Sequence, residues 1–325
     1  MKGVTTVSTE ALRDYWHPVA FSADVSESPR AVTLLDERVV LYRTASGRSV
    51  AHKDLCIHRG TPLSLGWVEE ETLVCAYHGW SYAPDGKCIR IPSVDPARKI
   101  PPKARLTTFR VTERYGIVWV CPGDPAAPIA DFPEFGEESF RTFLTEQDDW
   151  NASAARLVEN FVDTAHFAWV HPGLLGNRDQ PRVPPIAIAR DGHRIDVTMR
   201  MEVANAVHKG AYSEIYDQIT LPFTLRQVRT DPDGGRHIVF LAISPVSSNR
   251  LRRFSYKMRD YDLDAPDDRF IEKSSIVSAQ DRAIVEEQRP EELPVDLTAE
   301  LHVKGPDDPA LVYRKALAAI GVEVH

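Results

Sequence analysis

The sequence predicts an α+β protein with an all-β N-terminal part and a C-terminal part in which helices flank an antiparallel sheet. Three observations predict this class. Residues 30–123 contain short strand-like segments separated by turns such as Pro84-Asp85-Gly86. A stretch rich in Pro, residues 122–128, then interrupts the pattern. Beyond it, a helical segment, a run of alternating strands and further helical segments follow, which is an order typical of α+β domains.

The individual elements follow from local patterns. The expected N-terminal strands are Ala31–Leu35, Val39–Arg43, Ser49–His52, Thr72–Cys75, Ser81–Tyr82, Lys87–Ile91, Phe109–Glu113 and Gly116–Val120. Alternating apolar and polar residues predict C-terminal strands over Arg194–Val203, Tyr212–Leu221, Thr224–Thr230, Arg236–Pro245 and Arg252–Tyr261. Helices are expected over Ala152–Val170, from Asp267 or Asp268 as N-cap to about Gln288, and over Leu311–Ile320.

Composition excludes several classes of function. The net charge is −8 and the pI about 5.8, so the chain lacks the basic character of nucleic-acid-binding proteins. Met1 to Asp14 holds acidic residues and no apolar core, which argues against a signal peptide. The longest apolar stretches are too short to span a membrane, and we therefore expect a cytoplasmic protein without membrane partners.

Two Cys–His pairs carry the strongest chemical signal, Cys56-Ile57-His58 and Cys75-Ala76-Tyr77-His78. Two thiolates and two imidazoles form the ligand set of a Rieske [2Fe–2S] cluster, with two Cys on one iron and two His on the other. They are also a ligand set for structural zinc. Gly60 and Gly79 lie within two residues of each His, so the loops can fold closely over a cluster and direct N–H groups at sulfur. These neighbours favour the cluster.

The other two cysteines, Cys88 and Cys121, are expected to be small buried apolar residues. Four Cys in 325 residues do not form a disulfide framework.

A second group of metal-binding residue types lies in the first C-terminal helical segment. Two His and one Asp occur within twelve residues, and they indicate either a metal site or a proton relay. His166 and His171 are five residues apart and would diverge on a regular helix. However, Pro172 disfavours the helical conformation at His171, so this side chain can turn back towards His166. Asp163 and Asn160 lie about one and two turns earlier.

A non-heme Fe(II) oxygenase site needs a carboxylate in addition to two His. The carboxylate must come from elsewhere in the chain. The candidates on the long late helix are Glu272, Asp281, Glu286 and Glu287. The residues alone leave these four open, and the apolar neighbours of Asp281 fit a helix packed on a sheet.

Together these motifs resemble the Rieske non-heme iron oxygenases, over nearly the whole chain from Trp16. The pattern C-x-H-R-G … C-x-Y-H-G-W carries the resemblance, supported by the segment from Asn160 to His171 and by the sequence around Asp281. Cytochrome-complex Rieske proteins carry two further Cys in these loops, where this chain has Thr61 and Tyr77. The resemblance is greatest to the shorter monooxygenases and demethylases of the family.

The resemblance implies the cofactors and the site. Cys56, His58, Cys75 and His78 would hold the [2Fe–2S] cluster, and His166, His171 and Asp281 would hold a mononuclear Fe(II). Asp163 would be the electron bridge, meeting His78 of the next subunit in a homotrimer, and Asn160 would support the site. NAD(P)H would act through a separate reductase or ferredoxin, because the chain lacks a nicotinamide fingerprint. O2 and a small organic substrate complete the reaction.

The resemblance also implies three parts: a Rieske domain over residues 16–123, a connecting segment over 124–148, and a helix-grip catalytic domain with a curved antiparallel sheet over 149–325. The expected activity is hydroxylation or oxidative O- or N-demethylation, and the alternative is an aromatic-ring dihydroxylating dioxygenase. A pure electron carrier and a zinc-binding module are the other classes considered.

The expected pocket-lining residues are Ile215, Tyr216, Phe223, Ile238 and Phe240, in an apolar pocket that fits an aromatic or polycyclic molecule.

Overall fold

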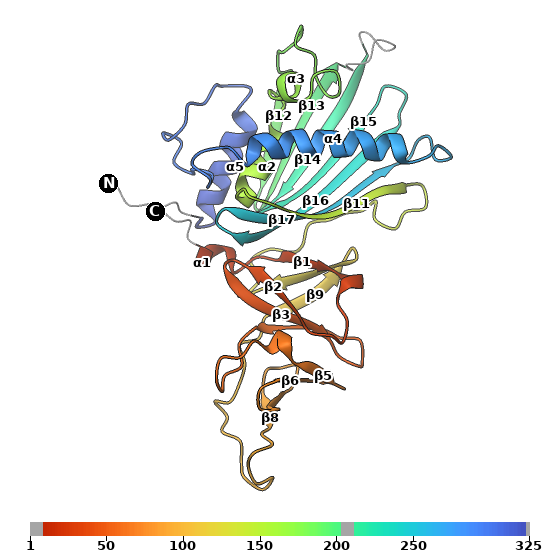
Figure 1. Ribbon diagram of the computed structural model, residues 1–325. Helices are drawn as coiled ribbons and strands as arrows, with labels where there is room; N and C mark the ends of the chain where they lie inside the picture. The colour runs from red at the N-terminus through yellow and green to blue at the C-terminus, as the bar shows by residue number, and fades with distance from the viewer. Residues whose placement is uncertain (1–8, 203–210, 323–325) are drawn as a thin grey trace. The chain divides into compact units, whose positions relative to one another are not determined.

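The computed structural model describes residues 9–202 and 211–322 (Figure 1). The chain divides into two compact units. One comprises Arg13–Pro128, and the other comprises Ile129–His325 together with Met1–Leu12, which includes the short helix α1 (Thr9–Leu12). Residues 1–8 and Val203, the end of one expected strand, lie outside the described residues.

The unit Arg13–Pro128 is built from strands, as expected. It contains three small antiparallel sheets, with strand orders β1-β10-β9, β2-β3-β4 and β5-β6-β7-β8. The strands are β1 (His17–Phe21), β2 (Arg30–Leu34), β3 (Glu37–Arg43), β4 (Ser49–Lys53), β5 (Trp67–Glu69), β6 (Thr72–Val74), β7 (Ser81–Tyr82), β8 (Cys88–Arg90), β9 (Arg110–Arg114) and β10 (Ile117–Cys121). Two single-turn 3-10 helices, η1 (Ser22–Asp24) and η2 (Leu63–Leu65), connect them.

The core of this unit anchors the two Cys–His loops. Cys56 and Cys75 belong to one buried cluster with Val40, Leu63 and Leu73. Each of these side chains is at most 2% exposed. Because both cysteines are fixed in the apolar core, the loops that follow them start from rigid positions.

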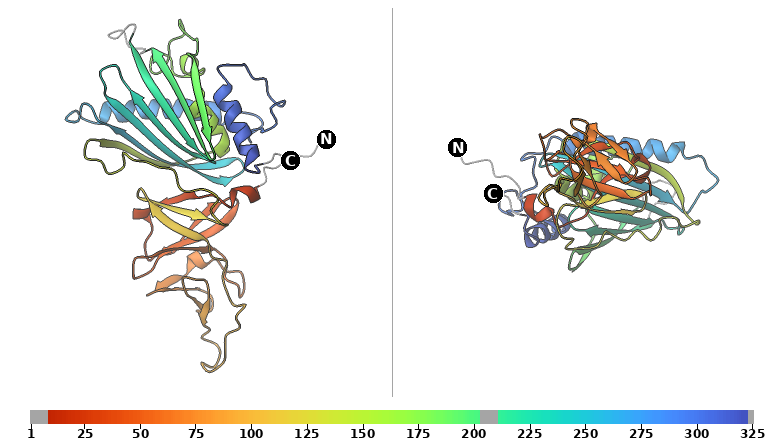
Figure 2. Two further views of the ribbon diagram at one scale, coloured as in Figure 1. Left: turned by 180° about the vertical axis from the view of Figure 1, so that it is seen from behind. Right: turned by 90° about the horizontal axis from the view of Figure 1, so that it is seen from below.

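The second unit contains a seven-stranded antiparallel sheet with the order β11-β17-β16-β15-β14-β13-β12. Its strands are β11 (Arg141–Trp150), β12 (Ile186–Asp191), β13 (Arg194–Glu202), β14 (Tyr212–Thr220), β15 (Thr224–Thr230), β16 (Arg236–Ser247) and β17 (Arg250–Arg259). The long helix α4 (Asp268–Val285) lies across one face of the sheet (Figures 1 and 2). The helix α5 (Asp308–Ala319) packs against α2 and β13. This arrangement confirms the α+β prediction.

One predicted helix is broken, and the break matters for the site. The expected helix Ala152–Val170 is observed as α2 (Ala154–Val162) and α3 (Phe167–Val170). Ser153 caps the start of α2, its side chain accepting a hydrogen bond from the backbone of Arg156. Asp163 ends α2 in an extended conformation, and its carboxylate accepts the N–H of Ala165 at 2.7 Å. Asp favours such local turns, and the helix therefore stops there.

The strand β11 lies mostly within residues 124–148, the expected connecting segment. Its second half carries three acidic residues, Glu146, Asp148 and Asp149, and does not look like a strand. In the structure, Asp148 accepts from Arg253 at 2.7 Å and Asp149 from Arg252 at 2.5 Å, both on the neighbouring strand β17. Cross-strand ion pairs of this kind supply the partners that make an acidic strand stable.

In the described part of the chain, no helix has both the length and the apolar character needed to cross a membrane.

Candidate metal centres

The two Cys–His loops have the same backbone hydrogen bonds. In each, the N–H of the cysteine donates to the carbonyl oxygen five residues later, at 2.8 Å for Cys56 and 2.9 Å for Cys75. In each, a glycine four residues after the cysteine donates back to its carbonyl oxygen. Gly60 and Gly79 have φ of 72° and 68°, values that favour glycine. The sequence thus builds two equivalent turns.

The turns bring four potential ligand groups together. The sulfur atoms of Cys56 and Cys75 are buried, and backbone N–H groups of Tyr77 and His78 hydrogen-bond to Cys75. The Nδ1 atoms of His58 and His78 lie 3.2 Å apart at the exposed end. Two thiols and two imidazole nitrogens from two loops, with N–H donors aimed at sulfur, fit a Rieske cluster.

Two aromatic side chains support this group. Tyr82 is fully buried, and its hydroxyl lies 3.1 Å from Cys56 Sγ. Burial raises the pKa of Tyr82, and Cys56 adds to the shift, so the hydroxyl keeps its proton and can donate to a deprotonated sulfur. The ring of Trp80 stacks on His58, with ring centres 4.5 Å apart. Sequence reasoning missed the contact of Tyr82, because nothing local in the chain joins it to Cys56.

The remaining cysteines are buried, as expected. Cys88 is 1% exposed and Cys121 is 0% exposed. Burial raises the pKa of the Cys121 thiol to about 11. Both behave as small apolar residues.

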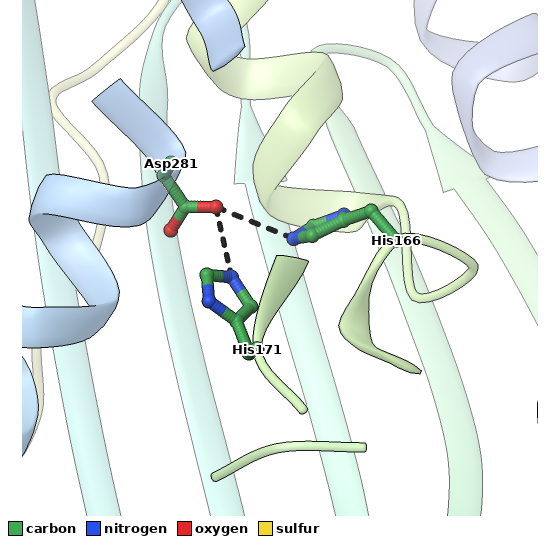
Figure 3. A group of neighbouring side chains, drawn as sticks. All are labelled: His166, His171 and Asp281. Atoms are coloured by element: carbon green, nitrogen blue, oxygen red, sulfur yellow. Dashed lines mark hydrogen bonds and ion pairs between the residues drawn. The ribbon is translucent and has the colours of Figure 1, made fainter. Parts of the chain in front are cut away.

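The second group lies where α2 breaks. The turn from Asp163 to His166 separates α2 from α3, and His171 ends α3 with φ −118° and ψ 49°. The expected loosening before Pro172 is therefore present, and the break at Asp163 adds to it. As Figure 3 shows, His166 and His171 point at the same oxygen of Asp281, which comes from α4.

The donor atoms of these three residues converge. Asp281 Oδ1 lies 2.9 Å from His171 Nε2 and 3.4 Å from His166 Nε2 (Figure 3). All three ligand atoms lie within 4.8 Å of one another. His171 is 0% exposed, so its imidazole is fixed within the unit.

A fourth residue sets the orientation of His171. Its Nδ1 atom lies 2.8 Å from Gln280 Oε1, which can only accept a hydrogen bond. The Nδ1 atom therefore carries a proton, and Nε2 faces Asp281, either as an N–H donor or, when deprotonated, as a lone pair. Nε2 and the Asp281 oxygen lie 2.9 Å apart, so a deprotonated Nε2 and the carboxylate could bind one cation together. This donor set fits a divalent iron with two His and one carboxylate. Gln280 was not singled out from the sequence, although it adjoins Asp281.

The charges at this site are strongly coupled. Burial raises the pKa of Asp281, but the contacts with His166 and His171 outweigh burial and lower the pKa to about 2. Burial lowers the pKa of His166, but Asp163 and Asp281 outweigh burial and raise the pKa to about 9. The site therefore favours a carboxylate with positive charge beside it.

The two other predicted residues also lie here. Asp163 Oδ2 is 3.6 Å from His166 Nδ1, an ion-pair distance rather than a hydrogen bond. The side chain of Asp163 is 40% exposed. Asn160 Nδ2 lies 3.5 Å from Asp281 Oδ1, a long hydrogen bond. Asp163 thus contacts the site from its exposed side, and Asn160 from α2.

The alternative carboxylates on the late helix do not reach the site. Glu272 is exposed, and the side chain of Glu287 is 81% exposed. Glu286 accepts hydrogen bonds from Arg282 and from the backbone of Asn151. Asp281 is the candidate that the fold brings to the two His.

A cavity of about 900 Å³ opens from this site between α4 and the sheet. One face of the sheet supplies its wall, including Ile215, Gln227, Arg229, His237, Val239 and Lys257. The cavity is more polar than the sequence suggested.

Ile215 is the one residue of the expected pocket set that lines this cavity. Tyr216, its neighbour on β14, donates to Asp196 at 2.6 Å instead. Phe240 stacks on Phe132. Neighbouring residues on a strand face opposite sides of the sheet, and the expected set mixed the two faces.

Comparison with known proteins agrees with these two centres. A Rieske [2Fe–2S] domain matches residues 15–110, and a vanillate O-demethylase oxygenase C-terminal domain matches residues 150–323. The chain is 32% identical over 322 residues to methylxanthine N1-demethylase NdmA of Pseudomonas putida, covering 95% of this chain and 89% of that protein. It is 29% identical to methylxanthine N3-demethylase NdmB of the same organism, covering 87% and 83%.

Solved structures show the same similarity. The structure of Pseudomonas putida NdmA with caffeine matches with a TM-score of 0.84 at 29% identity, covering 94% of this chain and 90% of that one. Dicamba monooxygenase bound to dicamba matches with a TM-score of 0.79 at 22% identity, covering 95% and 97%, and shows the shared fold. These proteins use a Rieske cluster and a mononuclear iron, take electrons from a reductase or ferredoxin, and consume O2. The chain therefore belongs to the Rieske oxygenase family with a vanillate O-demethylase-type C-terminal domain, and it is a terminal oxygenase component of this kind.

Proposed function

We propose that this oxygenase removes a methyl group from nitrogen or oxygen of a small aromatic or polycyclic substrate. The convergence of His166, His171 and Asp281 at the end of a large cavity is the observation that carries the proposal. The relatives named as methylxanthine demethylases support it. In the net reaction, a methylated substrate, O2, NAD(P)H and a proton give the demethylated product, formaldehyde, water and NAD(P)⁺.

We assign roles to the residues as follows. Cys56, Cys75, His58 and His78 hold the cluster. His166, His171 and Asp281 would hold a mononuclear iron, which would supply the site for O2 activation. Gln280 keeps the proton of His171 on Nδ1, so that Nε2 is available as a ligand.

Asp163 is the proposed entry point for electrons, in a homotrimer where His78 of one subunit lies beside Asp163 of the next. Two observations support this role. His78 is exposed at the end of its loop, and the side chain of Asp163 is 40% exposed while lying 3.6 Å from His166 Nδ1. A carboxylate between two ligand imidazoles can hydrogen-bond to both and hold both rings in place.

We also propose that the functional domains follow the sequence limits, 16–123 and 149–325, with 124–148 connecting them. The low cysteine content and the need for a reducing partner support a cytoplasmic location.

The test uses the purified holoenzyme with a surrogate ferredoxin reductase and a panel of N-methyl and methoxy aromatic compounds. We expect formaldehyde to form in proportion to NAD(P)H oxidised with at least one compound. Isotopically labelled O2 should place one labelled atom in formaldehyde. Incorporation of both atoms into an aromatic ring would instead establish the dihydroxylating alternative and contradict demethylation.

The bridging role is tested with Asp163→Ala. This variant should retain both metal centres and lose most coupled turnover, whereas Asp179→Ala, at an exposed position in the loop after α3, should behave as the parent enzyme. His166→Ala should lose the mononuclear iron and keep the absorption of the cluster. Full coupled activity in Asp163→Ala would rule out the bridging role.

A further inference from the structure

The unit Arg13–Pro128 carries an exposed basic segment, residues 87–105. The segment contains six basic residues and one acidic residue, in a chain whose net charge is −8. It includes β8, and Figure 1 shows the part that follows β8 as a loop that projects beyond the small sheet β5-β6-β7-β8. Positive charge is therefore concentrated at one place on a protein that is acidic as a whole.

The base of the basic segment lies against the Cys–His loops. Ile91 and Ile100 pack on the apolar core that contains both loop cysteines. Pro92 lies so close to Gly79 that a Cβ built on this glycine would be 3.1 Å from Pro92 Cγ. Gly79 directly follows His78 in the chain. A protein bound to the basic segment would therefore be held close to the proposed cluster.

Backbone hydrogen bonds fix the shape of the basic segment. The carbonyl oxygen of Ala104 accepts the N–H of Cys88 at 2.9 Å, which ties the end of the loop to β8. The carbonyl oxygen of Asp95 accepts the N–H of Arg98 at 2.9 Å, and its carboxylate accepts the N–H of Ala97 at 2.8 Å. The single acid of the segment is thus part of a backbone turn. A loop that is already ordered loses less entropy when it binds a partner.

Most of this positive charge is not paired within the unit. Two basic side chains lie near acids, in the pairs Arg105–Asp85 (2.8 Å) and Arg90–Glu69 (3.8 Å). For Arg98, Lys99 and Lys103, no carboxylate lies within 4.0 Å among residues 9–202 and 211–322. All three residues are exposed, so their charges can meet the surface of another protein.

An electron donor is the partner that fits this position. The oxygenase takes its electrons from a reductase or ferredoxin, which has to come close to the cluster. In the proposed homotrimer, His78 faces Asp163 of the next subunit, so the donor needs another approach. The basic segment offers one on the side of Gly79, and it would attract a protein with an acidic face.

We propose that residues 87–105 form the docking surface for the electron donor, a ferredoxin-type protein or domain with an acidic face, and that Arg98, Lys99 and Lys103 make its main ionic contacts. The proposal rests on the proposed oxygenase function, and it adds where the partner binds. One electron passes from the iron–sulfur centre of the donor to the cluster held by the two Cys–His loops, so the donor is oxidised by one electron and the cluster is reduced by one. Electron-transfer complexes bury little surface and are transient, which suits a small exposed loop.

The experiment measures docking in the absence of an organic substrate. The probe is an acidic plant-type [2Fe–2S] ferredoxin, used with the purified holoenzyme. Affinity is measured by calorimetry with both proteins oxidised, and the rate of cluster reduction is measured by rapid mixing with the reduced ferredoxin. We expect the ferredoxin to bind, and both the affinity and the second-order rate constant to fall by about tenfold between low and physiological ionic strength.

Charge reversal locates the contact. Arg98→Glu, Lys99→Glu and Lys103→Glu, combined in one variant, should lower the affinity and the second-order rate constant by about tenfold at low salt. The corresponding triple Gln variant should show a smaller loss of both. The reduction potential of the cluster, measured by redox titration, should stay the same, because the three side chains are exposed and solvent screens their charges.

The matched control reverses three exposed basic residues of the other unit, Arg182→Glu, Lys304→Glu and Lys315→Glu combined. It changes the net charge by the same amount and should bind the ferredoxin as the parent does. Direct contact is tested with a carbodiimide, which joins lysine amines to carboxylates. Mass spectrometry of the parent complex should show ferredoxin cross-linked to Lys99 or Lys103.

Three results would overturn the proposal. The first is that the ferredoxin does not bind the parent enzyme, and the second is that the triple Glu variant and the control lose affinity equally. The third is that the triple Glu variant dissociates into monomers in analytical ultracentrifugation, which would assign the basic segment to contacts between subunits. Demethylation is measured separately. Intact docking without demethylation of any methylated compound would count against the proposed function alone.

Discussion

Asp217 is a fully buried acid whose charge should destabilise the catalytic unit at neutral pH. It lies on β14 and is 1% exposed. Within residues 9–202 and 211–322, the one side-chain hydrogen bond to its carboxylate comes from Gln227 Nε2 at 2.7 Å. Burial raises its pKa from 3.8 to about 7, although the hydrogen bond from Gln227 opposes the shift. At a pH between these two pKa values, Asp217 is protonated in the folded chain and ionised in the unfolded chain.

The sign and size of the effect follow from linkage. Because the folded state binds more protons in this window, stability falls as the pH rises from about 4 to about 7 and is constant above it. A shift of about three units corresponds to roughly 4 kcal/mol once the pH exceeds 7. At about pH 5 the free energy of unfolding has fallen by only about 2 kcal/mol, because this pH is little more than one unit above the unfolded-state pKa.

We predict that Asp217→Asn removes this fall in the free energy of unfolding at higher pH. The Asn oxygen can still accept the hydrogen bond from Gln227, and the side chain has no charge at any pH. The thermal unfolding midpoint of the holoenzyme, followed by fluorescence, should rise more at about pH 8 than at about pH 5. The additional gain of about 2 kcal/mol corresponds to roughly 4–8 °C for a unit of this size.

The control and the refuting result are specific. Glu214→Gln removes a carboxylate from an exposed position on the same strand and should give no such pH-dependent gain. If Asp217→Asn changes the midpoint equally at both pH values, Asp217 is not the buried acid with a raised pKa that this reasoning requires.

The other predictions concern the two metal centres. Gln280→Leu should weaken binding of the mononuclear iron by about 10–100-fold, because His171 loses the acceptor that orients it. The affinity is measured by competition with a chelator. Gln280→Glu keeps an acceptor and should retain most of the affinity. Unchanged affinity in the Leu variant would contradict the orienting role. Tyr82→Phe should lower the reduction potential of the cluster by tens of millivolts, roughly 40 mV per kcal/mol of lost hydrogen bonding to Cys56 Sγ, measured by redox titration. An unaltered potential would show that the hydroxyl does not act on the cluster.

The sequence alone determined the features that depend on neighbouring residues. Each Cys–His pair lies within one turn, so Cys56 and His58, like Cys75 and His78, were identifiable from spacing and the adjacent glycines. Pro172 likewise indicated that the backbone would loosen at His171, since its restriction on the preceding residue is local. The alternating pattern of the C-terminal strands predicted the α+β class. The acidic strand β11 escaped notice, because its partners are arginines on β17, about a hundred residues away.

Only the tertiary structure decided which distant residues meet. Asp281 was one of several possible carboxylates, and its approach to His166 and His171 depends on how α4 lies across the sheet. The same packing brings Gln280 to His171. The alternation of apolar and polar residues gives each strand two faces but does not show which face points inward. Only the structure shows that Ile215 lines the pocket and that Tyr216 does not. Such contacts depend on register and helix placement, and long-range packing fixes both.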